Sequence, residues 1–199
     1  MDFLPVQHAA IIFDCDGTLV DSMPAHYEAW ILTLRRHGLD LDEDEFYALG
    51  GWPTFHVAKL VIERAASSVD PAVITHEKES EFERQLHRVQ AIEAISSVAR
   101  EHHGKIPLGV ATGGFRRICE GLLSAVDLKQ LFDTIVTCED VSRHKPAPDI
   151  YLEAARRLNV DPARCLAYED TDPGIAAARG AGMQVVDVRT VFQPRRVTR

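Results

Sequence analysis

A run of five apolar residues near the N-terminus ends directly in two carboxylates, and this feature constrains the fold more than any other. The run spans residues 9–13, and Asp14, Cys15, Asp16 and Gly17 follow it. Short apolar runs are typical of strands that are buried on both faces of a parallel sheet. Side chains two positions apart in a strand point the same way, so Asp14 and Asp16 share one side and Cys15 faces the other.

Short apolar runs alternate with stretches of helical periodicity again in the second half of the chain. We predict helices over residues 92–102, 115–126, 148–158 and 173–179. We predict strands over residues 108–111, 134–137, 165–168 and 184–188. Such alternation indicates the α/β class, with a doubly wound, Rossmann-like parallel sheet covered by helices on both faces. In these sheets ligands bind beyond the carboxyl ends of the strands.

Residues 23–91 interrupt this alternation with a segment that is helical throughout. Apolar positions recur at helical spacing over residues 24–37, 42–49 and 54–66, and a polar helical stretch begins at Pro71. We therefore predict an all-helical cap over residues 23–91. It is inserted into an α/β core that consists of residues 1–22 and 92–199.

Polar residues that suit a phosphate and a metal follow three further predicted strands. Thr112 and Gly113 precede a helix, where a hydroxyl and free N–H groups suit a phosphate. Lys145 follows a second strand, and Glu169 and Asp170 follow a third. Each feature alone has an ordinary explanation, such as a helix cap or a surface lysine. Together with the two aspartates of the first strand end, they predict a site for Mg²⁺ and a phosphate group.

Composition argues against several other classes of protein. The formal net charge of -8 and the pI of about 5.6 argue against a nucleic-acid partner. We see neither a signal peptide nor an apolar run long enough to span a membrane. We therefore expect a cytoplasmic protein, a monomer, whose partner is a small phosphorylated metabolite.

The cysteines and the C-terminal arginines are not expected to contribute to the site. The four cysteines lie far apart and form no C-x-x-C pair, so we expect neither a zinc site nor a disulfide framework. Arg195, Arg196 and Arg199 form a basic tail, which we expect to be a frayed end.

The motifs at the strand ends, taken in order, resemble those of the haloacid dehalogenase superfamily. They are Asp14-Cys15-Asp16-Gly17-Thr18, then Thr112, then Lys145-Pro146, then Glu169-Asp170. Nearly the whole chain takes part in the resemblance, which includes a helical cap after the first motif. Within the superfamily the chain is similar to the beta-phosphoglucomutase-like branch, and most of all to sugar-phosphate phosphatases of the fructose-1-phosphatase type. The features shared with the latter are Gly51-Trp52-Pro53-Thr54 and Val186-Asp187-Val188-Arg189.

The resemblance implies separate roles for the two aspartates of the first motif. Asp14 is the implied nucleophile, which forms an aspartyl-phosphate. Asp16 is the implied general acid and base, and its backbone carbonyl is an implied Mg²⁺ ligand. Asp14 and Asp170 are the implied side-chain ligands of Mg²⁺, and Glu169 is either a further ligand or a residue that supports them.

The remaining implied roles concern the phosphate and the sugar. Thr112 and the N–H group of Gly113 hold phosphate oxygens, and Lys145 offsets the negative charge on the nucleophile and the phosphoryl group. The cap closes over the site and recognises the sugar. The cap residues that we expect to contact the sugar are His26, Gly51, Trp52 and Thr54.

Three alternatives to a sugar-phosphate phosphatase differ from it in particular residues. A beta-phosphoglucomutase is the main one. Such a mutase binds a second phosphate through an arginine of its cap, and Pro53 stands at that position here. A true dehalogenase lacks the carboxylate that Asp16 provides. A catalytically silent binding module would have lost residues such as Asp14 or Lys145, and both are present.

Overall fold

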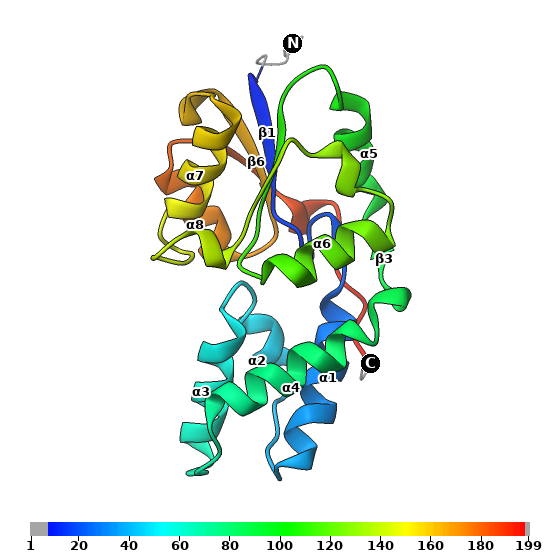
Figure 1. Ribbon diagram of the computed structural model, residues 1–199, viewed down its shortest axis with the longest axis vertical. Helices are drawn as coiled ribbons and strands as arrows, with labels where there is room; N and C mark the ends of the chain where they lie inside the picture. Colours follow the sequence, from blue (N-terminus) through cyan, green and yellow to red (C-terminus); the bar gives the residue numbers. More distant parts are fainter. Residues whose placement is uncertain (1–7, 198–199) are drawn as a thin grey trace.

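A five-stranded parallel sheet forms the centre of the α/β part of the molecule, as the sequence predicts (Figure 1). The computed structural model describes residues 8–197. The strands lie in the order β5-β4-β1-β6-β7. Their bounds are Ala10–Phe13 for β1, Leu108–Ala111 for β4, Thr134–Val136 for β5, Cys165–Glu169 for β6 and Gln184–Asp187 for β7. Because β1 lies in the middle, in register with β4 and β6, the residues that follow these three strands converge at one edge.

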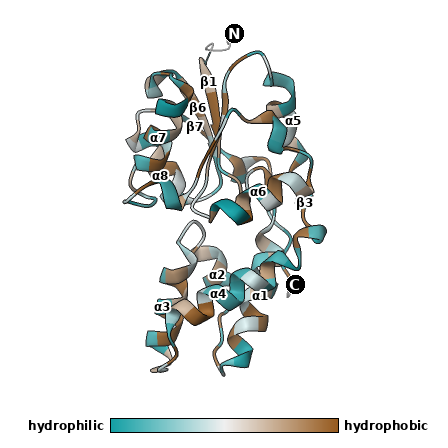
Figure 2. Ribbon diagram, in the orientation of Figure 1, coloured by the Kyte–Doolittle hydropathy of each residue, from teal (hydrophilic) through white to brown (hydrophobic). Residues whose placement is uncertain are grey.

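Two pairs of helices cover the two faces of this sheet. Residues Ile11 and Phe13 of β1 pack in one apolar cluster with α5 (Glu93–His102) and α6 (Arg116–Ala125). Residues Ala10 and Ile12 pack in a second cluster with α7 (Asp149–Leu158) and α8 (Asp172–Gly180). Figure 2 shows hydrophobic strands between helices in which hydrophilic and hydrophobic residues are mixed. The doubly wound α/β fold is thereby confirmed, and each bound of these strands and helices lies within one residue of the predicted one.

Four helices lie together beyond the carboxyl edge of the sheet, within the segment predicted as the cap (Figure 1). They are α1 (Met23–Arg36), α2 (Glu43–Ala48), α3 (Thr54–Arg64) and α4 (Pro71–Glu83). Asp42 and Asp70 cap α2 and α4 by accepting hydrogen bonds from backbone N–H groups. The four helices share an apolar cluster of their own, to which they contribute Trp30, Leu34, Phe46, Val61 and Ile74 among others.

Several short elements connect these parts and carry no clear sequence pattern. A two-stranded antiparallel ribbon, β2 (Val20–Asp21) with β3 (Gln90–Ala91), joins the points where the chain enters and leaves the helical segment. The sequence did not predict this ribbon, because two residues are too few to show alternation. The 3-10 helices are Leu86–Arg88, Lys129–Leu131, Cys138–Asp140, Pro162–Arg164 and Val188–Thr190.

The C-terminal tail packs against α2, so the expectation of a frayed end was wrong for Arg195 and Arg196. The Arg196 guanidinium lies 3.8 Å from the centre of the Tyr47 ring. The Tyr47 hydroxyl donates a hydrogen bond of 3.2 Å to the Arg195 carbonyl. The third arginine, Arg199, lies outside the described residues.

Among residues 8–197, no helix combines the length and the apolar character that crossing a bilayer requires.

Candidate active site

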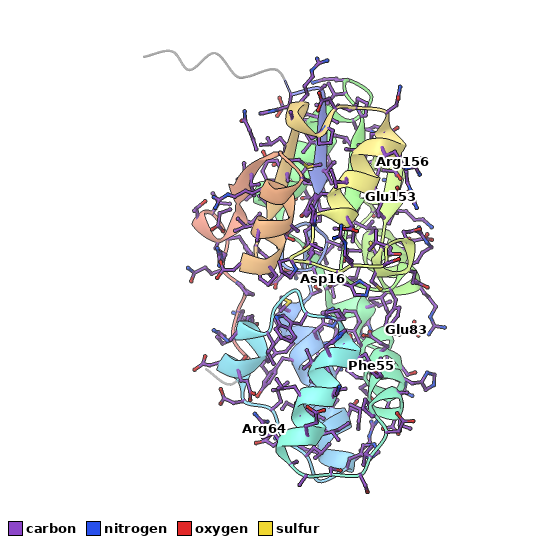
Figure 3. The ribbon with its side chains drawn as sticks, turned by 90° about the vertical axis from the view of Figure 1, so that its left-hand side faces the viewer. Asp16, Phe55, Arg64, Glu83, Glu153 and Arg156 are labelled. Carbon is purple, nitrogen blue, oxygen red and sulfur yellow. The ribbon has the colours of Figure 1, made fainter. Side chains whose placement is uncertain are left out.

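A pocket lies where the carboxyl edge of the sheet faces the four helices, and Figure 3 shows Asp16 at this junction. The loops after β1, β4, β5 and β6 reach it from the sheet side, and α1, α4 and the turn before α3 reach it from the other. Nine residues predicted for the site line this pocket: Asp14, Asp16, His26, Gly51, Trp52, Thr54, Thr112, Gly113 and Lys145. The two remaining predicted residues, Glu169 and Asp170, are not among the lining residues but cluster with Asp14.

Lys145 links the first and last motifs through two buried ion pairs. Its ammonium donates a hydrogen bond of 2.7 Å to Asp14 Oδ1 and another to Glu169 Oε1. Burial opposes the charge on Lys145, but Asp14 and Glu169 outweigh it and raise the pKa of Lys145 well above its ordinary value. Lys145 therefore remains a cation between two carboxylates.

Asp14 itself has a strongly perturbed carboxyl group. Burial raises the pKa of Asp14 to about 7, although the neighbouring Lys145 lowers it. Glu169 and Asp16 raise the pKa further because they add negative charge nearby. A cation in addition to Lys145 would favour the ionised form of Asp14.

Both oxygens of Glu169 are already engaged by hydrogen-bond donors. Oε1 accepts from Lys145 and, at 3.2 Å, from the Tyr151 hydroxyl. Oε2 accepts from the backbone N–H groups of Asp170 and Thr171, at 2.9 and 3.0 Å, and from the Thr171 hydroxyl. A Cβ atom at Gly174 would lie 1.7 Å from Oε1, so the absence of a side chain there makes room for this carboxylate. The geometry favours a supporting role for Glu169 over direct metal ligation.

Asp14, Glu169 and Asp170 form an acidic cluster in which one ligand atom from each lies within 4.8 Å of the others. The pKa of Asp170 is raised well above its ordinary value, first by burial and then by Glu169 and Asp14. The Thr18 hydroxyl donates to Asp170 Oδ1 at 3.1 Å. Crowded carboxylate oxygens of this kind are the donor set that Mg²⁺ prefers, so the residues fit the predicted metal. The Asp16 side chain lies outside this cluster.

The backbone conformation and the surroundings of Gly17 explain why a glycine follows the two aspartates. Its φ is +78°, in the left-handed region that favours glycine. A Cβ atom at this position would lie 2.3 Å from Asp170 Oδ2. Gly17 therefore permits both the turn of the loop and the approach of the Asp170 carboxylate.

Asp16 faces the helical segment and has a different set of partners. Its Oδ1 accepts from the Ser22 hydroxyl at 2.6 Å and lies 2.9 Å from His26 Nε2. The Lys78 ammonium lies 2.8 Å from His26 Nδ1. Because an ammonium can only donate, Nδ1 is the acceptor, and the ring proton therefore resides on Nε2 and points to Asp16.

The charges of this network follow from the same contacts. Burial and Lys78 lower the pKa of His26, despite the opposing effect of Asp16. Burial opposes ionisation of Asp16, but His26 and Ser22 outweigh it and hold the pKa of Asp16 below its ordinary value. These shifts favour an ionised Asp16 and a neutral His26 imidazole.

The turn between α2 and α3 lies against the loops of the sheet. A Cβ atom at Gly51, whose φ is +81°, would lie 2.9 Å from the Thr171 hydroxyl. A Cβ atom at Gly113 would lie 3.5 Å from the Gly51 carbonyl oxygen. The adjacent Thr112 is buried, and its hydroxyl accepts from the Gly114 N–H at 3.1 Å. The turn therefore covers the loop that carries Thr112 and Gly113.

Lys78 and Glu79 of α4 also line the pocket, and the sequence interpretation missed both. It treated the region from Pro71 onward as a polar helix. The available signal was spacing: Lys78 stands four residues after Ile74 and four before Phe82, and all three are buried. A lysine in line with two apolar residues on one helix face indicates a buried, paired charge.

Comparison with known proteins identifies relatives along most of the chain. A family model described as a haloacid dehalogenase-like hydrolase matches residues 8–182. The chain is 40% identical over 185 residues to the fructose-1-phosphate phosphatase YqaB of Escherichia coli K12, covering 92% of this chain and 97% of that protein. It is 34% identical over 195 residues to the validoxylamine A 7'-phosphate phosphatase of Streptomyces hygroscopicus subsp. limoneus, covering 90% and 84%. Among solved structures, the beta-phosphoglucomutase of Clostridium difficile is similar, with a TM-score of 0.82, 25% identity and coverage of 90% and 84%.

Proposed function

Since this chain belongs to the haloacid dehalogenase-like hydrolases and is a phosphoric monoester hydrolase, we propose that it hydrolyses small sugar phosphates through an aspartyl-phosphate. One observation carries this proposal. Asp14 and Asp16 line one pocket from one loop, yet Lys145 holds the first and His26 and Ser22 hold the second. Two carboxylates with different partners at one site suit two different chemical tasks.

In the first proposed step, a carboxylate oxygen of Asp14 attacks phosphorus. The bond between phosphorus and the sugar oxygen breaks, and that oxygen takes a proton from Asp16. In the second step a water molecule attacks phosphorus and gives a proton to Asp16, and the Asp14 carboxylate leaves. The two steps restore both aspartates.

Asp16 must be protonated for the first step and ionised for the second. Its hydrogen bonds from His26 and Ser22 favour the ionised form in the protein without substrate. A phosphoryl group in the pocket brings negative charge close to Asp16, and this raises a carboxyl pKa. Substrate binding therefore favours the form of Asp16 that the first step requires.

Mg²⁺ is the proposed cofactor, held by the side chains of Asp14 and Asp170 and by the Asp16 carbonyl. When bound, it would neutralise charge on the phosphoryl oxygens. Thr112 and the Gly113 N–H group are proposed to hold phosphate oxygens, with Lys145 as the second cation. Glu169 is proposed to hold Lys145 in place.

Residues 23–91 are proposed to act as the cap that covers the site and contacts the sugar. His26, Gly51, Trp52 and Thr54 line the pocket from this side. A mutase would need a further cation here for a second phosphate. Within residues 8–197, the basic side chains of the pocket other than His26 are Lys78 and Lys145, and both are engaged by carboxylates. The charges of the pocket therefore favour hydrolysis over mutase activity.

A phosphate-release assay tests the proposal. Purified protein with Mg²⁺ should release phosphate from hexose monophosphates and from an aryl phosphate, and EDTA should abolish the release. Asp14→Asn should be inactive, whereas the matched variant Asp40→Asn, at an exposed position outside the pocket, should retain wild-type rates. Full activity of Asp14→Asn would refute the assignment of the nucleophile. Glucose 6-phosphate formed from beta-glucose 1-phosphate with a bisphosphate primer would instead identify a mutase.

A further inference from the structure

Glu79 of α4 lines the pocket and has one oxygen without a donor. Its Oε1 accepts from the Thr54 hydroxyl at 2.5 Å and from Lys78 at 3.1 Å. Its Oε2 is buried and accepts no hydrogen bond from any part of residues 8–197. Buried carboxylate oxygens normally have a partner, and in a ligand pocket the missing partner is a ligand or a water molecule.

Glu79 is ionised and offers only acceptors to such a ligand. Burial opposes its charge, but Lys78, His26 and Thr54 outweigh burial and lower the pKa of Glu79. A carboxylate accepts hydrogen bonds and cannot donate them. Its complement is therefore a donor such as a hydroxyl group, and a second anion would be repelled.

The surroundings of Glu79 do not offset this repulsion. Lys78, the nearest cation, already contacts both His26 Nδ1 and Glu79 Oε1. The other lysine that lines the pocket, Lys145, is paired with Asp14 and Glu169. Three hydrogen bonds separate Glu79 from Asp16, through Lys78 and His26, so Glu79 is not in contact with the two aspartates proposed to act on phosphorus.

We propose that Glu79 accepts a hydrogen bond from a hydroxyl of the sugar and excludes substrates that carry a second anionic group. This inference rests on the proposed phosphatase activity and narrows its substrate class to neutral polyol or sugar monophosphates. Bisphosphates and phosphorylated carboxylic acids are disfavoured. Glu79 thus determines specificity without touching the reacting atoms.

The variant Glu79→Gln tests this inference, because it keeps the size of the side chain and removes its charge. Three substrates are compared by kcat/KM: fructose 1-phosphate, fructose 1,6-bisphosphate and p-nitrophenyl phosphate, which carries no sugar hydroxyl. We expect kcat/KM to fall about tenfold or more for the monophosphate, as for the loss of a charged hydrogen bond. It should rise or stay unchanged for the bisphosphate and stay within about twofold for the aryl phosphate.

Two controls separate specificity from a general structural effect. Glu63→Gln on α3, an exposed position outside the pocket, should leave all three values unchanged. Glu79→Asp retains the charge and should still discriminate against the bisphosphate. An equal loss on all three substrates in Glu79→Gln would overturn the inference, because Glu79 would then act only by positioning Lys78. Wild-type protein that is inert toward all three would overturn the proposed function itself, and the inference with it.

Discussion

Replacement of Lys145 by Met should destabilise the protein strongly, and more at high pH than at low pH. The Lys145 side chain is 2% exposed, and those of Asp14 and Glu169 are 8% and 1% exposed. Methionine is similar in length but leaves two buried carboxylates without their cation. Removal of one partner from a buried ion pair costs about 3–5 kcal/mol. For a chain of this size that corresponds to a fall in Tm of about 6–20 °C.

The pH dependence follows from the carboxyl groups that remain. Lys145 lowers the pKa of Asp14, so its removal raises that pKa above the value of about 7 that burial produces. Between the ordinary pKa of an aspartate and this raised value, the folded protein binds a proton that the unfolded chain has lost. Stability therefore decreases as the pH rises through this window, and protonation relieves the defect at acid pH.

Chemical denaturation in EDTA at pH 5 and pH 8 measures both effects. Lys129→Met, an exposed lysine paired with Glu120, is the matched control and should change the free energy of unfolding by less than about 1 kcal/mol. A value for Lys145→Met within about 0.5 kcal/mol of wild type at pH 8 would refute this account of the buried pair.

Three further predictions concern the glycine beside Glu169, the metal and the tail. Gly174→Ala should lower the free energy of unfolding by about 1–3 kcal/mol or more and reduce activity, because its Cβ would overlap Glu169. Gly180→Ala on the same helix is the control, since its Cβ would make only ordinary contacts with Pro148. Equal effects of the two variants in urea denaturation would contradict the steric explanation. Mg²⁺ binding should release protons near pH 6, since the pKa of Asp14 is about 7 and that of Asp170 is raised well above its ordinary value in the metal-free protein. Calorimetry in buffers of different ionisation enthalpy measures that release, and affinity that is independent of pH between 5 and 8 would argue against this metal site. Arg196→Ala should lower the free energy of unfolding by about 0.5–1 kcal/mol, because the contact with the Tyr47 ring is lost. Arg143→Ala, at an exposed arginine elsewhere, is the control. Equal Tm values for the two variants would show that the docked tail does not stabilise the protein.

The position of the main motifs could be predicted because strand order and strand polarity are strongly constrained. A short apolar run such as residues 10–13 has few alternatives to a buried parallel strand. Parallel strands have their carboxyl ends at one edge, so Asp14, Thr112 and Glu169 had to approach one another. The position of Lys145 at this edge could be predicted for the same reason, but its ion pairs with Asp14 and Glu169 could not.

The contacts between separate helices could not be predicted in the same way. The network of Asp16, His26 and Lys78 depends on how α1 packs against α4, and local periodicity does not encode the rotation of one helix against another. The His26 ring also stacks on Phe82, with 3.6 Å between ring centres, which fixes its direction. Tail docking on Tyr47 is likewise a tertiary contact between residues far apart in the sequence.

The most direct test of the central claim is a burst experiment with Asp16→Asn, Mg²⁺ and p-nitrophenyl phosphate. Nitrophenolate leaves without a proton, so the first step does not need Asp16, whereas the attack of water does. The account predicts a rapid, stoichiometric burst of nitrophenolate, followed by slow turnover. Acid quenching should then recover a phosphorylated peptide that contains Asp14. Absence of both burst and covalent phosphate, in a variant that still binds Mg²⁺ and while the wild type turns over, would contradict an aspartyl-phosphate at Asp14.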